Sequence, residues 1–279
     1  MVTGARPVAL RVAYDAAHGG RWTSLRGGGR EWLWRGPAPG RHEVCPDDAF
    51  VDAGGLEECL PTVRGEPDHG EVWSRQWRSG GPGTAVIERP TFTLSRRITD
   101  SGGVVVADYL LAADPGYRFV WAAHALLDLS TAARLDAPTG TPTRLHPEAA
   151  ALLPPGSWPI GDPWLTGPWP APAGLTLDMF GPDDGTALGA VLLDCARVQV
   201  IDGPDRLTLE LECAGQPRST ALWRNLGGWP ADGPYRSIGI EPMLGAAFDL
   251  ADAGPSDAAV VPPTGEVTWR LTISAHRNH

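Results

Sequence analysis

The sequence predicts an all-β protein, built as a large antiparallel sandwich of two sheets. Apolar and polar residues alternate with a period of two along most of the chain, as in Leu207–Glu212. This alternation predicts strands with one buried face and one solvent-exposed face. Helical periodicity is scarce, and the 35 Gly and 28 Pro residues lie between the apolar runs, where they indicate turns. Many short strands separated by turns are typical of a sandwich.

The predicted strands follow one another along the whole chain. The first half contains the alternating segments Val8–Tyr14, Arg21–Leu25, Glu31–Trp34, Thr84–Thr99, Val104–Leu111 and Tyr117–Leu129. The second half contains Leu175–Phe180, Ala187–Asp194, Arg197–Ile201, Arg206–Glu212, Thr220–Arg224, Ser237–Glu241 and Glu266–Ser274. No internal repeat or low-complexity linker divides the chain, so we expect one domain spanning residues 1–279.

One helical segment and one long loop interrupt this series of strands. Pro147–Leu153 is compatible with about two helical turns, which Pro154 and Pro155 would end because proline cannot continue a helix. The stretch Pro154–Pro172 is rich in Pro and Trp, and we interpret it as an ordered loop over one end of the sheets.

Charge and composition exclude several classes of function. The chain has 23 basic and 33 acidic residues, a net charge of −10, and no cluster of basic side chains. This argues against nucleic acid as a partner, because phosphate neutralisation supplies most of that affinity. Every basic residue is Arg. The absence of Lys excludes a Schiff-base aldolase, a pyridoxal-phosphate lysine and a phosphate-binding loop ending in Gly-Lys-Ser/Thr.

The hydropathy pattern predicts a soluble, cytoplasmic protein with no membrane partner. The longest apolar run, Val104–Ala113, is broken by Asp108 and is shorter than the roughly 18 residues of a membrane span. Met1–Tyr14 alternates and lacks the continuous apolar segment of a secretory signal. The cysteines form no Cys-x-x-Cys pair, so we predict that they are buried small apolar residues: Cys45, Cys59, Cys195 and Cys213.

Twelve Trp residues are a high number for this length. Those in alternating strands are predicted to fill the core: Trp22, Trp32, Trp34 and Trp269. Others lie in loop-like contexts, where core and ligand-facing roles both stay open: Trp73, Trp77, Trp158, Trp164, Trp169 and Trp229. An indole face packs well against the C–H face of a sugar ring, and its N–H can donate a hydrogen bond at the rim.

Three titratable residues stand out as candidates for chemistry. His69 follows a run rich in Gly and Pro, and His124 interrupts an apolar strand, where a structural role is also open. Glu241 ends the apolar run from Ser237, and a carboxylate there must be hydrogen-bonded or functional. Pro242 removes a backbone donor directly after it, which suits the end of a strand at the mouth of a pocket. His146 is predicted to lie on the surface.

Together, several of these segments resemble the aldose 1-epimerase (galactose mutarotase) family. Gly19–Arg26 followed by Arg30–Trp34 is similar to an early family strand that reads Gly-Gly-x-x-x-Ser-Leu before an apolar Glu-Leu-Leu. Further similar segments are Gly54–Thr62, Asp68-His69-Gly70, Glu241-Pro242-Met243 and the Trp-bearing closing strand Glu266–Ser274. Their order is kept over nearly the whole chain. The resemblance implies a divergent member with a galactose mutarotase-like β-sandwich and a sugar pocket on its concave face.

The resemblance also implies roles for individual residues in the interconversion of α and β anomers of an unassigned sugar. Glu241 would be the general base for the anomeric hydroxyl, and His124, placed opposite it, would be the general acid for the ring oxygen. His69 would hydrogen-bond the ring oxygen or a neighbouring hydroxyl, Asp68 would orient His69, and Arg75 would bind a hydroxyl. The sugar-facing Trp candidates are Trp73, Trp164 and Trp229. No cofactor or metal is required, and the expected partner is a small carbohydrate.

The sequence is also compatible with other hypotheses about function. The pocket could belong to a non-catalytic carbohydrate-binding or sensing protein, or carry out other chemistry, on a sugar phosphate or a glycosylated natural product. A metal site formed by Asp68, His69, His124 and Glu241 has compatible ligand types but no short ligand spacing. The oligomeric state is not predicted.

Overall fold

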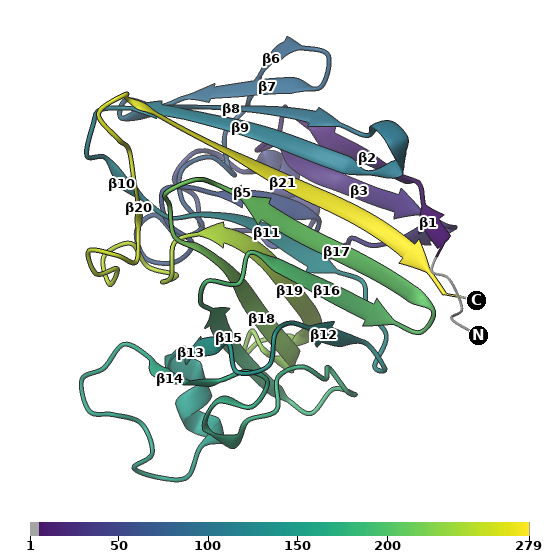
Figure 1. Cartoon of the computed structure of the whole chain (residues 1–279), viewed down its shortest axis with the longest axis vertical. Helices are drawn as coiled ribbons and strands as arrows, with labels where there is room; N and C mark the ends of the chain where they lie inside the picture. Colours follow the sequence, from purple (N-terminus) through teal and green to yellow (C-terminus); the bar gives the residue numbers. More distant parts are fainter. Residues whose placement is uncertain (1–5, 279) are drawn as a thin grey trace.

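The predicted all-β sandwich is confirmed. The structure, a computed structural model, describes residues 6–278, and within them the strands form a nine-stranded sheet A, a ten-stranded sheet B and a two-stranded ribbon. The two large sheets face each other, and strands distant in sequence lie side by side in both (Figure 1). Strand pairing within the sheets is antiparallel, as the period-two alternation predicts.

Sheet A has the order β12-β16-β17-β21-β9-β8-β7-β6, with β1 paired to β21. Its strands are β1 (Arg6–Val8), β6 (Arg78–Gly81), β7 (Thr84–Glu88), β8 (Phe92–Thr99), β9 (Val105–Ala113), β12 (Arg134–Asp136), β16 (Arg197–Asp202), β17 (Asp205–Glu212) and β21 (Glu266–Arg277). The long β21, yellow in Figure 1, therefore lies in the middle of the sheet, between β17 and β9.

Sheet B has the order β14-β13-β15-β18-β19-β11-β5-β3-β2, with β4 paired to β3. Its strands are β2 (Leu10–Asp15), β3 (Arg21–Gly27), β4 (Arg30–Glu31), β5 (Leu56–Cys59), β11 (Trp121–Leu127), β13 (Pro142–Leu145), β14 (Leu165–Pro168), β15 (Thr186–Leu192), β18 (Arg218–Trp229) and β19 (Tyr235–Leu244). The ribbon pairs β10 (Arg118–Phe119) with β20 (Ala259–Val260), and the short 3₁₀ helices are η1 (Pro39–Glu43), η2 (Ser101–Gly103), η3 (Pro147–Leu152) and η4 (Pro172–Gly174).

Several predicted segments differ from the structure in their bounds. Thr84–Thr99 is two strands, β7 and β8, because Pro90 lies in the turn between them. Leu175–Phe180 is not a strand and makes only one bridge, from Met179 to Arg134. The predicted helical turns form η3, and Pro154–Pro172 includes the edge strand β14 besides loop.

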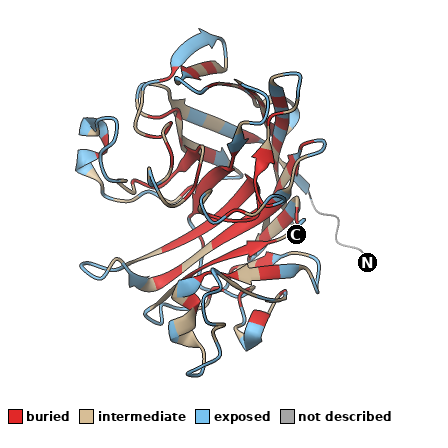
Figure 2. Ribbon diagram, turned by 90° about the vertical axis from the view of Figure 1, so that its left-hand side faces the viewer, coloured by how far each residue is buried: buried red, intermediate tan, exposed pale blue. Residues whose placement is uncertain are grey.

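The main core fills the space between the sheets. Within sheet B, the strands β5, β11, β15 and β19 are buried along most of their length, and buried strands run through the middle of Figure 2. Trp22, Trp32 and Trp269 are buried there, as predicted. Trp34 is only half-buried and stacks on Tyr235, with 5.3 Å between ring centroids, so the core prediction is wrong for this residue. Three loop Trp residues are also buried: Trp73, Trp77 and Trp169.

A charged network crosses this core between the sheets. Arg96 on β8 donates to Glu58 on β5 at 2.7 Å, and both side chains are completely buried. Glu58 also accepts hydrogen bonds from Tyr109 and from the Trp121 indole, each at 2.8 Å. Because every oxygen of this carboxylate has a partner, the sandwich tolerates a charge at its centre.

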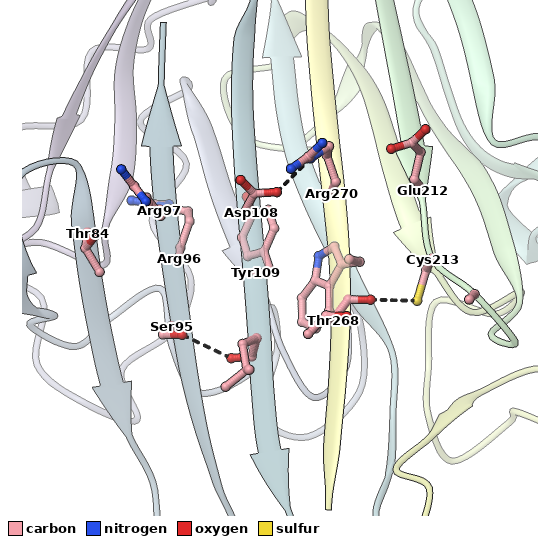
Figure 3. A pocket seen from close by; sticks show the side chains of 13 residues that line it. Thr84, Ser95, Arg96, Arg97, Asp108, Tyr109, Glu212, Cys213, Thr268 and Arg270 are labelled. Carbon is pink, nitrogen blue, oxygen red and sulfur yellow. Dashed lines mark hydrogen bonds and ion pairs between the residues drawn. The ribbon is translucent and has the colours of Figure 1, made fainter. Parts of the chain in front are cut away.

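The outer face of sheet A carries a row of alternating charges. Arg97, Asp108, Arg270 and Glu212 lie directly opposite one another on four neighbouring strands (Figure 3), and Asp108 and Arg270 are 2.7 Å apart. A shallow groove of about 540 Å³ crosses this face. Cross-strand pairs of opposite charge stabilise a solvated sheet surface, and this role explains the row of charges without a ligand.

The predictions for the cysteines and for His146 have mixed outcomes. Cys59, Cys195 and Cys213 are buried as predicted, whereas Cys45 is exposed. His146 is buried and packs against Phe248, so its predicted surface position is wrong. No helix among residues 6–278 is long and apolar enough to cross a membrane. The first five residues of the N-terminal segment Met1–Tyr14 lie outside the described residues.

Candidate functional site

His124 and Glu241 lie side by side on the two central strands of sheet B. On β11 and β19, Ala122 pairs with Met243 and Leu126 pairs with Gly239. This register places His124, midway along β11, directly opposite Glu241 on β19. The distance from His124 Nε2 to Glu241 Oε1 is 3.7 Å. We expected the two groups on opposite sides of a sugar, but both extend from the same sheet.

Pro242 lies inside β19 and does not end it, contrary to the sequence-based interpretation. The strand continues to Leu244, and Pro242 is the register partner of Thr220 on β18. Toward β11, however, no pairing is formed between the Ala122 and Leu126 positions. Pro242 has no N–H to donate there, so the ladder opens beside His124 and Glu241.

The face of sheet B that carries this pair points away from the main core. On β11, Trp121 and Ala123 belong to the intersheet core, whereas Ala122 belongs to a separate apolar cluster on the opposite face. His124 has the parity of Ala122, so it shares that opposite face. Val63 and Phe248, from loops, cover this face and bury it.

Gly239 gives the Glu241 carboxylate its position. The two residues share one face of β19, and a Cβ at residue 239 would overlap Glu241 Oε1 and lie 3.0 Å from the Trp223 Cβ. A side chain at residue 239 is therefore incompatible with this placement of the carboxylate.

If Glu241 is the general base that the resemblance implies, Gly239→Ala should lower the rate of anomer interconversion by roughly 10- to 100-fold, because a small displacement of a reacting group is costly. The rate is measured as enzyme-catalysed anomer exchange, and circular dichroism checks the fold. Gly40→Ala is the matched control, since a Cβ at residue 40 meets no atom within 4 Å. A folded Gly239→Ala protein with the wild-type rate would contradict this role.

His124 and Glu241 open onto a cavity of about 740 Å³. Its lining combines aromatic rings with titratable groups: Ala49, Phe50, Asp52, Val63, Arg64, Gly65, Asp68, His69, His124, Glu148, Ala151, Leu152, Gly185, Thr186, Ala187, Trp223, Gly228, Trp229, Glu241 and Phe248. An apolar cavity of this size with a few convergent polar groups is typical of a small-molecule site.

Burial shifts the proton affinity of both central residues. The pKa of Glu241 is raised above its ordinary value of 4.5, chiefly because burial disfavours the charged form, while His124 and Arg64 act in the opposite direction. The pKa of His124 is lowered below 6.5, again chiefly by burial, and Glu241 opposes this. Glu241 Oε2 is buried and has no hydrogen-bond partner among the described residues. Shifted pKa values and an unpartnered carboxylate oxygen are features of functional sites.

His69 faces His124 from the loop that covers sheet B. Its ring centroid is 5.0 Å from that of His124, and its ring stacks on Phe50 at 3.5 Å. Nδ1 lies 3.1 Å from Asp68 Oδ1, although poorly aligned for a hydrogen bond. The backbone of His69 has a φ of +60°, which is unfavourable for a residue with a side chain and is typical of strained functional positions.

Arg64 and Asp52 also line the cavity, and neither is predicted from the sequence. Arg64 forms an ion pair with Glu148, and its guanidinium lies over the rings of Trp223 and Phe248, at 5.5 and 5.3 Å from their centroids. Asp52 accepts a 2.5 Å hydrogen bond from Tyr235. The chain has 23 Arg residues, and nothing in the sequence distinguishes Arg64 from the others. Asp52 lies in an irregular segment, where an Asp does not indicate a functional site.

The cavity brings together five of the eight residues proposed from the sequence. His124, Glu241, His69, Asp68 and Trp229 line it. The remaining three do not: Trp73, Arg75 and Trp164.

Each of these three has another structural partner. Trp73 is buried behind the cavity wall, with its ring against Phe50 at 4.9 Å between centroids. Arg75 pairs with Asp47 at 3.0 Å. Trp164 packs under Arg144, at 4.0 Å from the guanidinium.

The residues do not favour a metal site at the cavity. Among residues 6–278, the group that brings at least three His, Cys, Asp or Glu ligand atoms within 4.8 Å of one another is Asp15, His18 and His42. None of these residues lines the cavity. The proposed set of Asp68, His69, His124 and Glu241 therefore does not converge as metal ligands do.

The fold defines the class of structure. A two-sheet antiparallel sandwich with this topology is a galactose mutarotase-like fold, and the resemblance stated from the sequence is confirmed at the level of the fold. No protein-family model and no curated protein sequence matches this chain. The identities to solved structures are low, which makes the chain a divergent example of this fold.

Three solved structures illustrate the similarity. The Slr1438 protein of Synechocystis aligns with 100% of this chain and 97% of its own, with a TM-score of 0.69 and 13% identity. A protein of Escherichia coli K12, provisionally named an aldose 1-epimerase, aligns with 98% and 99%, with a TM-score of 0.66 and 12% identity. A galactose mutarotase-like protein of Lactobacillus casei aligns with 98% and 100%, with a TM-score of 0.61 and 15% identity.

Proposed function

We propose that this protein is an aldose 1-epimerase-like enzyme that interconverts the α and β anomers of a sugar. One observation carries the proposal: a buried carboxylate and a buried imidazole, 3.7 Å apart, face one cavity of about 740 Å³. The names of similar structures, an aldose 1-epimerase and a galactose mutarotase-like protein among them, support a sugar as the ligand. We also propose that the domain comprises residues 1–279, and its cytoplasmic location stays a prediction.

The pair supplies both proton transfers that ring opening requires. Glu241 accepts the proton of the anomeric O1 hydroxyl as the C1–O1 bond becomes a carbonyl, and His124 donates a proton to O5 as the C1–O5 bond breaks. Both oxygens are bonded to C1, so two groups side by side on one sheet reach them together. The aldehyde then rotates by half a turn about C1–C2. O5 attacks C1 again, returns its proton to His124, and O1 recovers its proton from Glu241.

Other cavity residues would hold the sugar during these steps. His69, presented by its stack on Phe50, donates or accepts a hydrogen bond at the ring oxygen or an adjacent hydroxyl. Arg64 donates to hydroxyls, and Asp52 accepts from them. The faces of Trp223 and Trp229 pack against the C–H groups of the sugar.

Anomer exchange measured by saturation-transfer NMR on a panel of free aldoses tests the proposal. We expect exchange above the spontaneous rate for at least one aldose. Sugar affinity by calorimetry without faster exchange would instead identify a binding protein. Acceleration confined to 6-phosphosugars would assign the substrate to that class, and no acceleration with any aldose or phosphosugar would refute the enzyme.

The pH dependence of the rate should reflect both shifted pKa values. Glu241 must be ionised, so the rate falls as the pH drops through its pKa, which lies above 4.5. His124 must be protonated, so the rate also falls as the pH rises through its pKa, which lies below 6.5. We expect a narrow bell-shaped profile of kcat/KM with its maximum on the acid side of neutrality, after subtraction of spontaneous exchange. A catalysed rate that still rises above about pH 8 would contradict this assignment.

A further inference from the structure

Asp15, His18 and His42 bring three possible metal ligands together outside the cavity, near the turn between β2 and β3. One ligand atom of each lies within 4.8 Å of the other two, and within residues 6–278 no other His, Cys, Asp or Glu residues form such a group. His18 Nδ1 is 2.7 Å from Asp15 Oδ2, while Asp15 Oδ1 accepts from the Ala17 N–H at 3.0 Å. The rings of His18 and His42 meet edge-on, with 4.6 Å between their centroids. The proposed reaction uses none of these side chains.

The turn between β2 and β3 holds the His18 backbone in a fixed position. The N–H of Gly19 donates to the Arg75 carbonyl at 3.0 Å. Gly19 has a φ of +78°, and a Cβ there would overlap the carbonyl oxygen of Trp73. The conformation of the turn therefore depends on a glycine and on close contact with a neighbouring loop, and His18 is positioned before any ligand binds.

A buried arginine connects this turn to η1, the 3₁₀ helix that contains His42. Arg41 directly precedes His42, and its guanidinium donates to the carbonyl of His18 at 3.2 Å and to that of Trp73 at 2.9 Å. Its charge is compensated by the buried carboxylate of Glu57 at 3.0 Å. The backbones that carry the two histidines are thus joined by a buried side chain, and His42 needs only a rotation of its own ring to approach His18.

The distances within the group fit a small divalent ion. Nitrogen and oxygen ligands lie about 2.0–2.2 Å from a tetrahedral zinc ion, and therefore roughly 3.3 Å from one another. The 2.7 Å between His18 and Asp15 and the 4.8 Å limit for the whole group bracket this value. His42 is exposed, so its ring can turn without displacing packed neighbours.

The ligand types and the surrounding charges favour zinc. Imidazole nitrogen suits Zn²⁺, whereas Mg²⁺ and Ca²⁺ prefer sites built from oxygen ligands. Two arginines lie near the group, but both face the Glu57 carboxylate, Arg21 at 3.8 Å and Arg41 at 3.0 Å. The positive charge next to the site is therefore largely compensated, and the Asp15 carboxylate can pair with a cation.

We propose that Asp15, His18 and His42 form a zinc site, with water completing the coordination of the ion. The bound ion links η1 to the turn between β2 and β3 and so adds a second connection to the one that Arg41 makes. A ligand that binds only the folded chain stabilises it. The site lies outside the cavity, and this inference does not depend on the proposed function.

Calorimetric titration of the chelator-treated full chain with Zn²⁺ tests the site. We expect one Zn²⁺ per chain, and no measurable binding of Mg²⁺ under the same conditions. His18→Ala and His42→Ala should each weaken zinc binding roughly 10-fold or more, since even the loss of a group that only orients a ligand costs about that much. Zn²⁺ should also raise the thermal unfolding midpoint of the wild type, and raise it less in either variant.

Three control variants separate this site from other sources of zinc binding. His276→Ala removes a histidine from another part of the surface, Cys45→Ser removes an exposed thiol, and His124→Gln alters the cavity. All three should bind Zn²⁺ as the wild type does. Unchanged binding in both His18→Ala and His42→Ala, a loss of binding in any of the three controls, or no zinc binding by the wild type would overturn the site.

Discussion

Replacing Glu241 with Gln should abolish most of the activity and at the same time stabilise the fold. The amide cannot take the O1 proton, so we expect the rate of anomer exchange to fall by about 100-fold or more. The carboxylate is buried, and its Oε2 has no partner within residues 6–278. Removing its charge should therefore raise the free energy of unfolding at pH 7 by about 0.5–2 kcal/mol, the range of single stabilising substitutions.

The pH dependence of that stability gain has a definite sign. Because the folded state raises the pKa of Glu241, wild-type stability is greatest while the residue is protonated and declines as the pH rises from the ordinary pKa of 4.5 toward the folded pKa. The advantage of Glu241→Gln should grow over this window and vanish below it, as measured by urea unfolding at several pH values. Glu212→Gln, on the exposed outer face of sheet A, is the control: it should leave the rate unchanged and change the unfolding free energy by less than about 0.5 kcal/mol. A Glu241→Gln protein that is less stable than wild type at pH 7 would contradict the claim that the buried Glu241 carboxylate lowers the unfolding free energy.

Arg96→Met should destabilise the protein more than any surface substitution. It leaves the Glu58 carboxylate without its cation in a completely buried position, where only Tyr109 and Trp121 still donate to it. Breaking a buried ion pair in this way typically costs about 3–5 kcal/mol of unfolding free energy. Urea denaturation of the variant and the wild type measures the loss directly.

The neighbouring residue offers a matched control. Arg97 is adjacent on β8 but exposed, so Arg97→Met should change the unfolding free energy by less than about 0.5 kcal/mol. Adding Glu58→Gln to Arg96→Met should recover part of the loss, because the unpaired charge disappears. A loss below about 1 kcal/mol in Arg96→Met would show that this ion pair is not what compensates the buried charge.

The sequence predicted the architecture because alternation with a period of two reports directly on antiparallel sheet. Long strands with one solvent-exposed face, such as β17 and β21, were predicted to within three residues at each end. The strand β5 was missed because all four of its residues, including Glu57 and Glu58, are buried. Charged residues on both faces of a strand break the apolar–polar alternation. Their burial is explained only by the ion pairs that they form in the folded protein.

The candidate site was predictable only in part, for a similar reason. His124 and Glu241 interrupt apolar strands, and such an interruption can be recognised in the sequence alone. Arg64 and Asp52 lie in irregular segments, where a polar residue is unremarkable. Trp73 and Arg75 follow His69 closely in the chain, yet they lie outside the cavity lining, because proximity in a loop does not fix the direction of a side chain.

A double-mutant cycle on His124 and Glu241 tests the central claim most directly. Anomer exchange is measured for the wild type, His124→Gln, Glu241→Gln and the double variant, all shown to be folded. We expect each single change to cost about 100-fold or more and the double variant to be little slower than the slower single, because the two groups act in one step. Losses that simply multiply, or one single variant with the wild-type rate, would show that the carboxylate and the imidazole do not work as a pair.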